Sequence, residues 1–546
     1  MADDRLEERL GPRRGARLLP LVGLFLFVIA RQLTWSLTNP LFQGPDEVVH
    51  IQMVGQLDKH GLSFYRLPSP VTWRDLESSY DFHQDWYRQK GVIANPDVKP
   101  LYVQGSRWGL NERENLHHSG FDRVDGLTYY RYQSYPYPPL YYWSIAKVVG
   151  LARSSGATLI NYQFGMRLVQ MAFYVLFIAA ALLLTGEVIQ DRFSRVWTFS
   201  CILFHPMLIF MGSLVNNDNG LLPFSLFLIL GGVRLLKHPE DRPAIWMMAI
   251  AAICLTLTKA TGFLLVLAVY PVIAGLLALS KRSGLILKLM PGFAVSGALF
   301  VLLPRWIGEF TVDGYTPGRL AVSQYIEIIF GWLGWDMTRN WLGQFAWFEV
   351  NFPSTIYIMF ITLLGCAVLL SATHLATAIA KRKFDVHLKL FSFLFLTVLA
   401  VVLGALVYQY AVSSKFGVFI QGRYTLSALP LVYLCVGMIL SSTLRQAKRR
   451  PVILGSYLAA TGFLACLVCL SVVGLGMIVR RFFWNSGISA GEMVLRVMQY
   501  KPVLMKNSLG FAGLGAAYVL GHFGFVAYFA WFARDWYRQI KRPLPA

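Results

Sequence analysis

Charged side chains are scarce in this sequence. Asp, Glu, Lys and Arg make up 14% of the 546 residues, whereas a soluble chain carries about 25%. Hydrophobic residues make up 55%, and the mean hydropathy is +0.49. Several apolar runs reach the roughly 20 residues that a helix needs to cross a bilayer. The shortage of charge therefore excludes a soluble globular protein and indicates an all-α, multi-pass membrane protein.

The sequence also lacks the motifs of several protein classes. It has no Walker motif, no G-x-G-x-x-G motif and no Ser/His/Asp signature, so nothing supports a nucleotide-using reaction on the cytoplasmic side. All six cysteines lie in apolar segments, so we interpret them as packing residues rather than disulfides or metal ligands. No small-residue cleavage site follows the first apolar run, which we therefore expect to be a membrane span and not a signal peptide.

We expect about twelve membrane spans. Basic residues concentrate in the loops on the side of the N-terminus, and the short loops on the other side carry almost none. The positive-inside rule then places both termini in the cytoplasm, and it accounts for the net charge of +21 without nucleic acid. The expected spans are 18–38, 164–185, 194–212, 217–236, 244–258, 261–280, 289–306, 353–373, 390–410, 425–443, 452–478 and 509–532.

These spans divide the chain into three parts. Residues 1–17 form a cytoplasmic N-terminus, 18–440 the main transmembrane region, and 441–546 the C-terminal transmembrane helices and a cytoplasmic tail. The main region contains two large outer loops. The first, 39–163, should hold short surface helices, and the second, 307–352, is rich in Trp and should hold a helix half-buried in the interface.

Charge gathers where the first outer loop begins, in the sequence NPLFQGPDEVVH (39–50). Pro45 suits the first position of a helix expected over 45–58, and Asp46 and Glu47 follow in its first turn. Because residues three and four apart share one face of a helix, His50 lies on the face of both acids. Two carboxylates and an imidazole would then lie at the outer surface. Acids in a first turn also complement the helix dipole, so chemistry is not required to explain them.

Two cations interrupt the nearly uncharged outer ends of the later spans. Lys259 follows the fifth span and Arg423 begins the tenth. Cations at this depth are costly unless paired or hydrated, and they are functional candidates by default. Arg offers a planar fork that suits phosphate, and Lys a point charge, so we expect a phosphate site on the outer face. Alternatively, each cation could reach the interface or pair with a carboxylate.

Two further polar features lie on the expected outer face. Asn216, Asn217 and Asp218 close the third span. They could bind a sugar or a cation through oxygen ligands, or they could cap the next helix. Arg31, in the outer half of the first span, could pair with an acid of the 45–58 helix.

The order of these motifs resembles that of the GT-C superfamily, whose members are integral-membrane glycosyltransferases that use lipid-phosphate-linked sugars on the outer face of the membrane. Within that pattern the chain is most similar to a bacterial family of predicted membrane proteins of unknown function. The resemblance covers roughly residues 18–440. It rests on the P-D-E-x-x-H signature (Pro45 to His50), a P-P-L-Y-Y element (Pro138 to Tyr142), an N-N-D turn (Asn216 to Asp218), Lys259, and a Q-G-R-Y element (Gln421 to Tyr424).

The resemblance implies a GT-C fold in the bacterial plasma (inner) membrane. It also implies transfer of a sugar from a polyprenyl-phosphate donor to a hydroxyl of a glycan, lipid or protein acceptor in cell-envelope glycan biosynthesis. The catalytic Asp of related transferases falls on Asp46, as general base. Glu47 and His50 would orient it, bind the acceptor or hold a divalent cation, which is the one cofactor that these residues suggest. The donor phosphate would be bound by Lys259, Arg423, Tyr424 and Gln421, and the sugar or acceptor by Asn217, Asp218 and Tyr141.

Two other functions are compatible with the same features. A transporter or flippase of lipid-linked sugars would also need an outer cavity, intramembrane cations and interfacial aromatic residues. Transporters usually bind their substrate near the midplane between broken helices, whereas the candidate residues here gather at one face. A scaffold with a degenerate site is the third reading, and the intact acidic pair argues against it.

Overall fold

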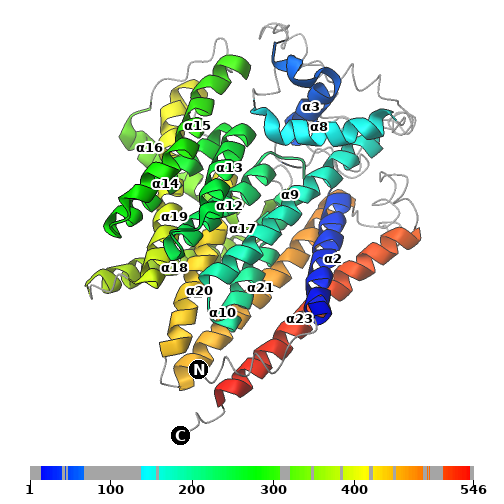
Figure 1. Ribbon diagram of the computed structural model, residues 1–546. Coiled ribbons are helices and arrows are strands. Elements are labelled where there is room, and N and C mark those ends of the chain that lie inside the picture. Colours follow the sequence, from blue (N-terminus) through cyan, green and yellow to red (C-terminus); the bar gives the residue numbers. More distant parts are fainter. Residues whose placement is uncertain are drawn as a thin grey trace.

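The computed structural model describes residues 14–39, 44, 47–66, 137–154, 159–307, 320–345, 350–380, 385–416, 422–446, 450–483, 489, 491 and 508–541. Within these ranges the chain is almost entirely helical (Figure 1). Every span that we expected coincides with a helix. These are α2 (Arg14–Thr38), α9 (Leu159–Val188), α10 (Arg192–Phe204) followed by α11 (Pro206–Gly212), α12 (Asp218–Lys237), α13 (Arg242–Thr258), α14 (Ala260–Leu279), α15 (Ser283–Ile307), α18 (Ser354–Ala380), α19 (Val386–Phe416), α20 (Leu429–Gln446), α21 (Arg450–Phe483) and α23 (Ser508–Lys541).

Nine of the described helices are long and apolar enough to cross a membrane, and α10 with α11 would make a tenth as one bent span. The described apolar parts of α2 and α13, 22–38 and 242–258, are shorter. An all-α, multi-pass membrane protein is therefore confirmed, as is its location in a membrane. The buried core consists of the faces that these helices turn toward one another, with α12 and α20 the most enclosed of the spans.

Three short elements of the first outer loop lie across one end of this bundle (Figure 1). They are α3 (Glu47–His60), the 3₁₀ helix η1 (Gly61–Arg66) and α8 (Pro139–Ser154). Ile51, Val54 and Leu57 recur at helical spacing on α3, and they pack with Tyr142 and Ile145 of α8 in a separate core cluster. The expected 45–58 helix is thus present, with described bounds two residues later at each end.

The segment expected to form the second outer loop contains short helices that are partly buried against the bundle, and their place in a membrane interface stays a prediction. Its described elements are α16 (Val322–Ile328), the π-helix η2 (Ile329–Leu333), α17 (Gly334–Leu342) and two short antiparallel strands, β1 (Gln344–Phe345) and β2 (Val350–Asn351), paired through Gln344 with Asn351 and Phe345 with Val350. Trp341 of α17 is buried, whereas Phe330 of η2 is 87% exposed. The loop therefore presents one side to the bundle and one side outward.

Our expectation that Arg31 could pair with an acid of the 45–58 helix is wrong. Its Nη1 donates to the carbonyl of Leu203 at 2.7 Å, and its Nη2 donates to the Tyr174 hydroxyl at 3.0 Å. The physical reason is a 53° bend between α10 and α11 at Pro206, which has no N–H to continue the helix. The bend exposes carbonyls at the negative end of α10, and the buried guanidinium satisfies one of them.

Candidate functional site

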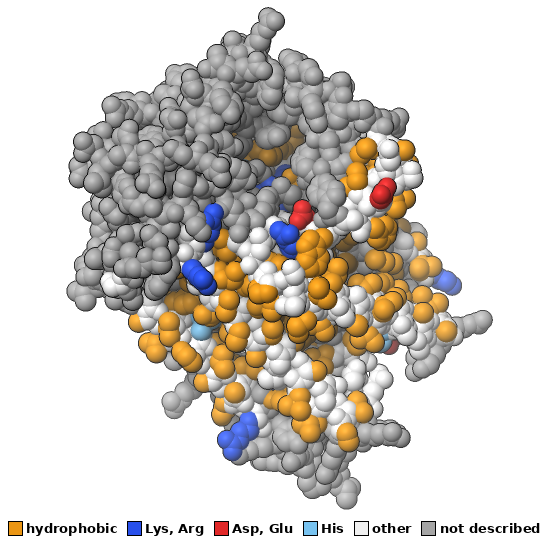
Figure 2. Space-filling view, turned by 180° about the vertical axis from the view of Figure 1, so that it is seen from behind, with side chains coloured by type: hydrophobic (Ala, Val, Ile, Leu, Met, Phe, Trp, Pro, Cys, Tyr) orange, Lys and Arg blue, Asp and Glu red, His pale blue; other side chains and the backbone are white. Residues whose placement is uncertain are grey.

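The candidate site lies where α3 and α8 meet the ends of α2, α9 and α12–α14. Ten residues were expected there, and the structure describes eight of them. Asp46 and Gln421 lie outside the described residues. Figure 2 shows a largely hydrophobic face on which Lys and Arg side chains gather with acidic ones in the upper half.

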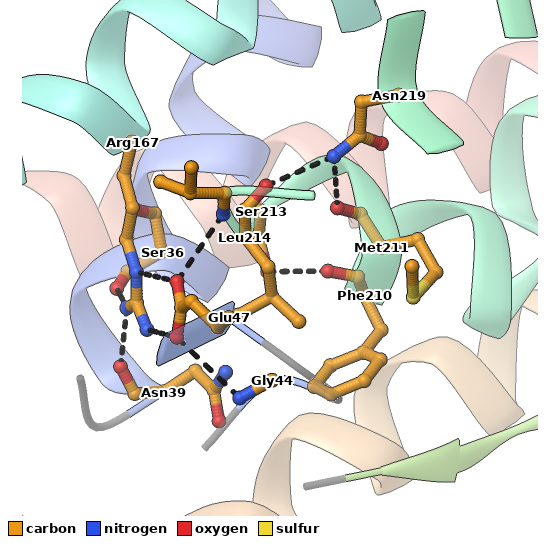
Figure 3. A network of polar contacts seen from close by, with 11 residues as sticks. Ser36, Asn39, Gly44, Glu47, Arg167, Phe210, Met211, Ser213, Leu214 and Asn219 are labelled. Atoms are coloured by element: carbon orange, nitrogen blue, oxygen red, sulfur yellow. Dashed lines mark hydrogen bonds and ion pairs between the residues drawn. The ribbon is translucent and has the colours of Figure 1, made fainter. Parts of the chain in front are cut away.

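Glu47 forms the central polar contact of the site (Figure 3). Arg167 of α9 donates to it through Nε and Nη2, to Oε1 and Oε2 at 2.7 Å each, and both side chains are 0% exposed. The backbone N–H of Val215 adds a bond to Oε1 at 3.2 Å, and that of Gly44 adds one to Oε2 at 3.4 Å. Both carboxylate oxygens are therefore occupied by donors. This geometry ties α3 to the bundle and does not fit a divalent cation, which Arg167 would repel.

Arg167 also caps the carboxyl end of α2. Its Nη1 donates to the carbonyls of Ser36 at 2.6 Å and Asn39 at 2.7 Å (Figure 3). A cation at the carbonyl end of a helix satisfies groups that have no partner within that helix and complements its dipole. Sequence analysis missed this residue. The signal was present, because Arg167 is a lone charge in the first turns of a long apolar helix, and such charges are rarely without a partner.

The turn between α11 and α12 is fixed by side chains on its two sides (Figure 3). Asn219 Nδ2 donates to the carbonyls of Met211 at 2.8 Å and Leu214 at 2.9 Å. The Ser213 hydroxyl donates to the Phe210 carbonyl at 2.7 Å. These bonds satisfy the carbonyl end of α11, so the residues that follow are held in one conformation at the start of α12.

His50 links α3 to α8, and Tyr141 links α8 to that turn. His50 Nδ1 lies 2.7 Å from the hydroxyl of Tyr142, and the two rings stack. The Tyr141 hydroxyl accepts a bond from the Asn216 N–H at 3.0 Å. Burial raises the pKa of the Tyr141 phenol well above its ordinary value, so this hydroxyl stays protonated at neutral pH.

Asn217 and Asp218 begin α12. Asn216 Oδ1 accepts the Asp218 N–H at 2.8 Å, whereas Asn217 makes no capping bond with its side chain. The Asn217 amide is fully buried, and neither of its polar atoms has a hydrogen-bond partner in the described structure. Asp218 Oδ1 lies 2.5 Å from Lys259 Nζ, so Lys259 takes the carboxylate partner that was one of its two alternatives.

Lys259 and Arg423 meet at one aromatic ring. Lys259 separates α13 from α14 in an extended conformation, and its Nζ lies 4.9 Å from the centroid of the Tyr424 ring. Arg423 belongs to the 3₁₀ helix η3 (Gly422–Ala428), and its guanidinium carbon lies 5.5 Å from the same centroid. A cation over the face of an aromatic ring is attracted by the negative potential of that face. Two cations 164 positions apart in the chain therefore contact one ring, and one of them, Lys259, also pairs with Asp218.

A family model described as "Predicted membrane protein (DUF2142)" matches residues 26–432. The chain belongs to this family. The match contains all ten candidate residues, and α21 and α23 follow its end. The DUF2142 family has no known function, so membership confirms a membrane protein and leaves the reaction and the GT-C resemblance untested. No curated protein matches the chain.

Proposed function

We propose that this protein is a GT-C-type glycosyltransferase that moves a sugar from a polyprenyl phosphate to an acceptor hydroxyl on the outer face of the bacterial inner membrane. The observation that carries the proposal is the meeting of Lys259 and Arg423 at the Tyr424 ring. Both cations are nearly buried at one end of a membrane bundle, where each needs an anionic or polar partner to offset the loss of water.

The donor phosphate fits this cluster chemically. Arg423 offers a planar fork of N–H donors to phosphate oxygens. Lys259 offers an ammonium group that its pair with Asp218 holds in place. These cations would stabilise the charge that grows on the phosphate as the sugar leaves. Tyr424 holds them on one ring, and Gln421 would approach from the same segment. The neutral groups of Asn217 and Tyr141 are suited to sugar or acceptor hydroxyls, which both donate and accept hydrogen bonds.

Asp46 is the proposed general base. Its neighbour Glu47 is fixed by Arg167, so the chain enters α3 at the same end of the bundle as the cation cluster. Asp46 would take the proton of the acceptor hydroxyl while that oxygen bonds to the sugar carbon. The bond from the sugar carbon to the phosphate oxygen breaks, and polyprenyl phosphate leaves from the opposite face of the sugar, with inversion at that carbon. Both termini would be cytoplasmic, and no step uses a metal.

The test uses purified protein and a labelled polyprenyl-phosphate sugar, with donors and acceptors drawn from cell-envelope extracts. Asp46→Asn should lower turnover by about 10²- to 10⁴-fold, the usual contribution of a general base. Asp58→Asn, an acid of α3 outside the candidate site, is the matched control and should retain turnover. Near-normal turnover by Asp46→Asn, with unchanged unfolding, would show that Asp46 is only a first-turn acid.

One observation favours a transporter or flippase of lipid-linked sugars as the second candidate. The break between α10 and α11 resembles the discontinuous helices that carry transporter binding sites. The cation cluster, however, lies at the ends of α12–α14 and not at that break. The two functions separate in detergent solution, where a transferase still forms glycosylated product and a flippase has no compartments to connect.

A further inference from the structure

Helix α17 of the second outer loop is hydrogen-bonded to η3, the segment that carries Arg423 and Tyr424. Trp341 of α17 donates its Nε1–H to the carbonyl of Gly422 at 3.0 Å and to Thr425 Oγ1 at 2.8 Å. The Thr425 hydroxyl donates to the same Gly422 carbonyl at 3.0 Å. One indole therefore holds η3 at two points, immediately before Arg423 and immediately after Tyr424.

The contact between α17 and η3 leaves no room for a side chain at Gly422. A Cβ built there would lie 2.8 Å from the Trp341 ring and 2.9 Å from the Asn340 Cβ, and it would overlap the Met337 carbonyl oxygen. Distances this short are not tolerated without movement of the backbone. Glycine at this position is therefore what allows η3 to lie directly against α17.

The helix that makes this contact is itself anchored. Asn340 Nδ2 donates to Gln344 Oε1 at 2.6 Å, which ties α17 to β1. The Tyr357 hydroxyl of α18 donates to the Gly343 carbonyl at 2.7 Å and accepts the Phe352 N–H at 2.9 Å. The end of α17 is thus fixed to a membrane-spanning helix. By contrast, η3 is a 3₁₀ helix, a form with weaker hydrogen-bond geometry that rarely runs long unaided.

We propose that Trp341 is a positioning residue, which holds Arg423 and Tyr424 in the geometry that binds the lipid-linked phosphate. The second outer loop thereby becomes part of the donor site, with Trp341 acting through Arg423 and Tyr424 and not by touching the phosphate itself. This inference rests on the proposed function, because the phosphate ligand comes from it.

The test compares Trp341→Phe, which keeps an aromatic ring and removes the N–H donor, with Trp335→Phe on the same helix. The Trp335 and Tyr357 ring centroids are 5.9 Å apart, and Trp335→Phe is a matched loss of an indole that leaves the Trp341 bonds to η3 in place. Each protein is placed in phosphatidylcholine nanodiscs. Binding of undecaprenyl phosphate is measured against undecaprenol, which lacks the phosphate, and hydrogen–deuterium exchange is followed over 422–428.

Trp341→Phe should weaken undecaprenyl phosphate binding about tenfold, the order expected when a donor shared by two acceptors is lost. Undecaprenol binding should not change, and exchange over 422–428 should accelerate. Gly422→Ala disturbs the same contact from the other side and should act in the same direction. Trp335→Phe should leave both measurements near wild type.

The two ideas fail in different ways. If Arg423→Gln weakens phosphate binding but Trp341→Phe changes neither binding nor exchange, the positioning role is overturned and the proposed function stands. If the wild type binds both lipids equally and Arg423→Gln has no effect, the proposed donor site is wrong. The positioning role then falls with it, whatever the exchange shows.

Discussion

Replacing Arg167 with leucine removes at least four side-chain hydrogen bonds at once, two to Glu47 and two to the end of α2. The Glu47 carboxylate would stay buried with only the N–H groups of Val215 and Gly44 as partners. Removing one member of a buried ion pair typically costs about 3–5 kcal/mol, because the remaining charge is uncompensated. We expect Arg167→Leu to lower the free energy of unfolding by that amount.

The double variant Glu47→Leu/Arg167→Leu should recover part of the loss. It removes both charges, so the remaining cost is that of backbone groups left unpaired, about 1–3 kcal/mol. The double variant should therefore be about 2 kcal/mol more stable than Arg167→Leu alone. Because Glu47→Leu also leaves one buried charge unpaired, the losses of the two single variants should together exceed that of the double variant by several kcal/mol in the double-mutant cycle. Lys237→Met is the control, because its pair with Glu187 is partly exposed and should contribute under about 1 kcal/mol.

Unfolding can be followed in mixed detergent micelles through the reactivity of the thiols of Cys201 and Cys435, which are buried in the folded protein. If the two single variants each lose less than about 1 kcal/mol and their losses add, the pair does not secure α3. The placement of the first outer loop would then need another explanation.

Three further outcomes are expected. Arg31→Met should lower the free energy of unfolding by about 1–3 kcal/mol in the same assay, because the Leu203 carbonyl loses its only described donor within the bend. Gly212→Ala should lower it by a similar amount, since an added Cβ would overlap the Tyr174 ring, whereas Gly55→Ala meets nothing and should be neutral or stabilising. Chelation with EDTA should leave undecaprenyl phosphate binding unchanged, because both described carboxylates of the site already pair with cations; a metal-dependent loss of binding would contradict this reading.

The spans were predictable because each is a local property of the sequence. An apolar run of sufficient length specifies a helix wherever it lies, and the expected boundaries followed from this rule. The bend at Pro206 was missed, although the local signal was there, because a continuous apolar run suggested one unbroken helix.

The partners of the charged residues could not be predicted in the same way. Glu47 and Arg167 are 120 positions apart, and no local pattern relates them. Arg31 was expected to find a carboxylate, since charges usually pair, but it binds a carbonyl that becomes available only through a bend elsewhere. The meeting of Lys259 and Arg423 was anticipated only to the extent that both lie at outer ends of spans.

The packing of α23 on α2 affects how the protein is assembled. Gly521 lies so close to Phe27 that any side chain there would overlap its ring, and His522 stands edge-on to the same ring. The ribosome makes α2 first among the described helices and α23 last. The side of Phe27 that packs on Gly521 and His522 therefore has its partner only once α23 has been made, so the bundle can close on that side only as a late step of membrane insertion.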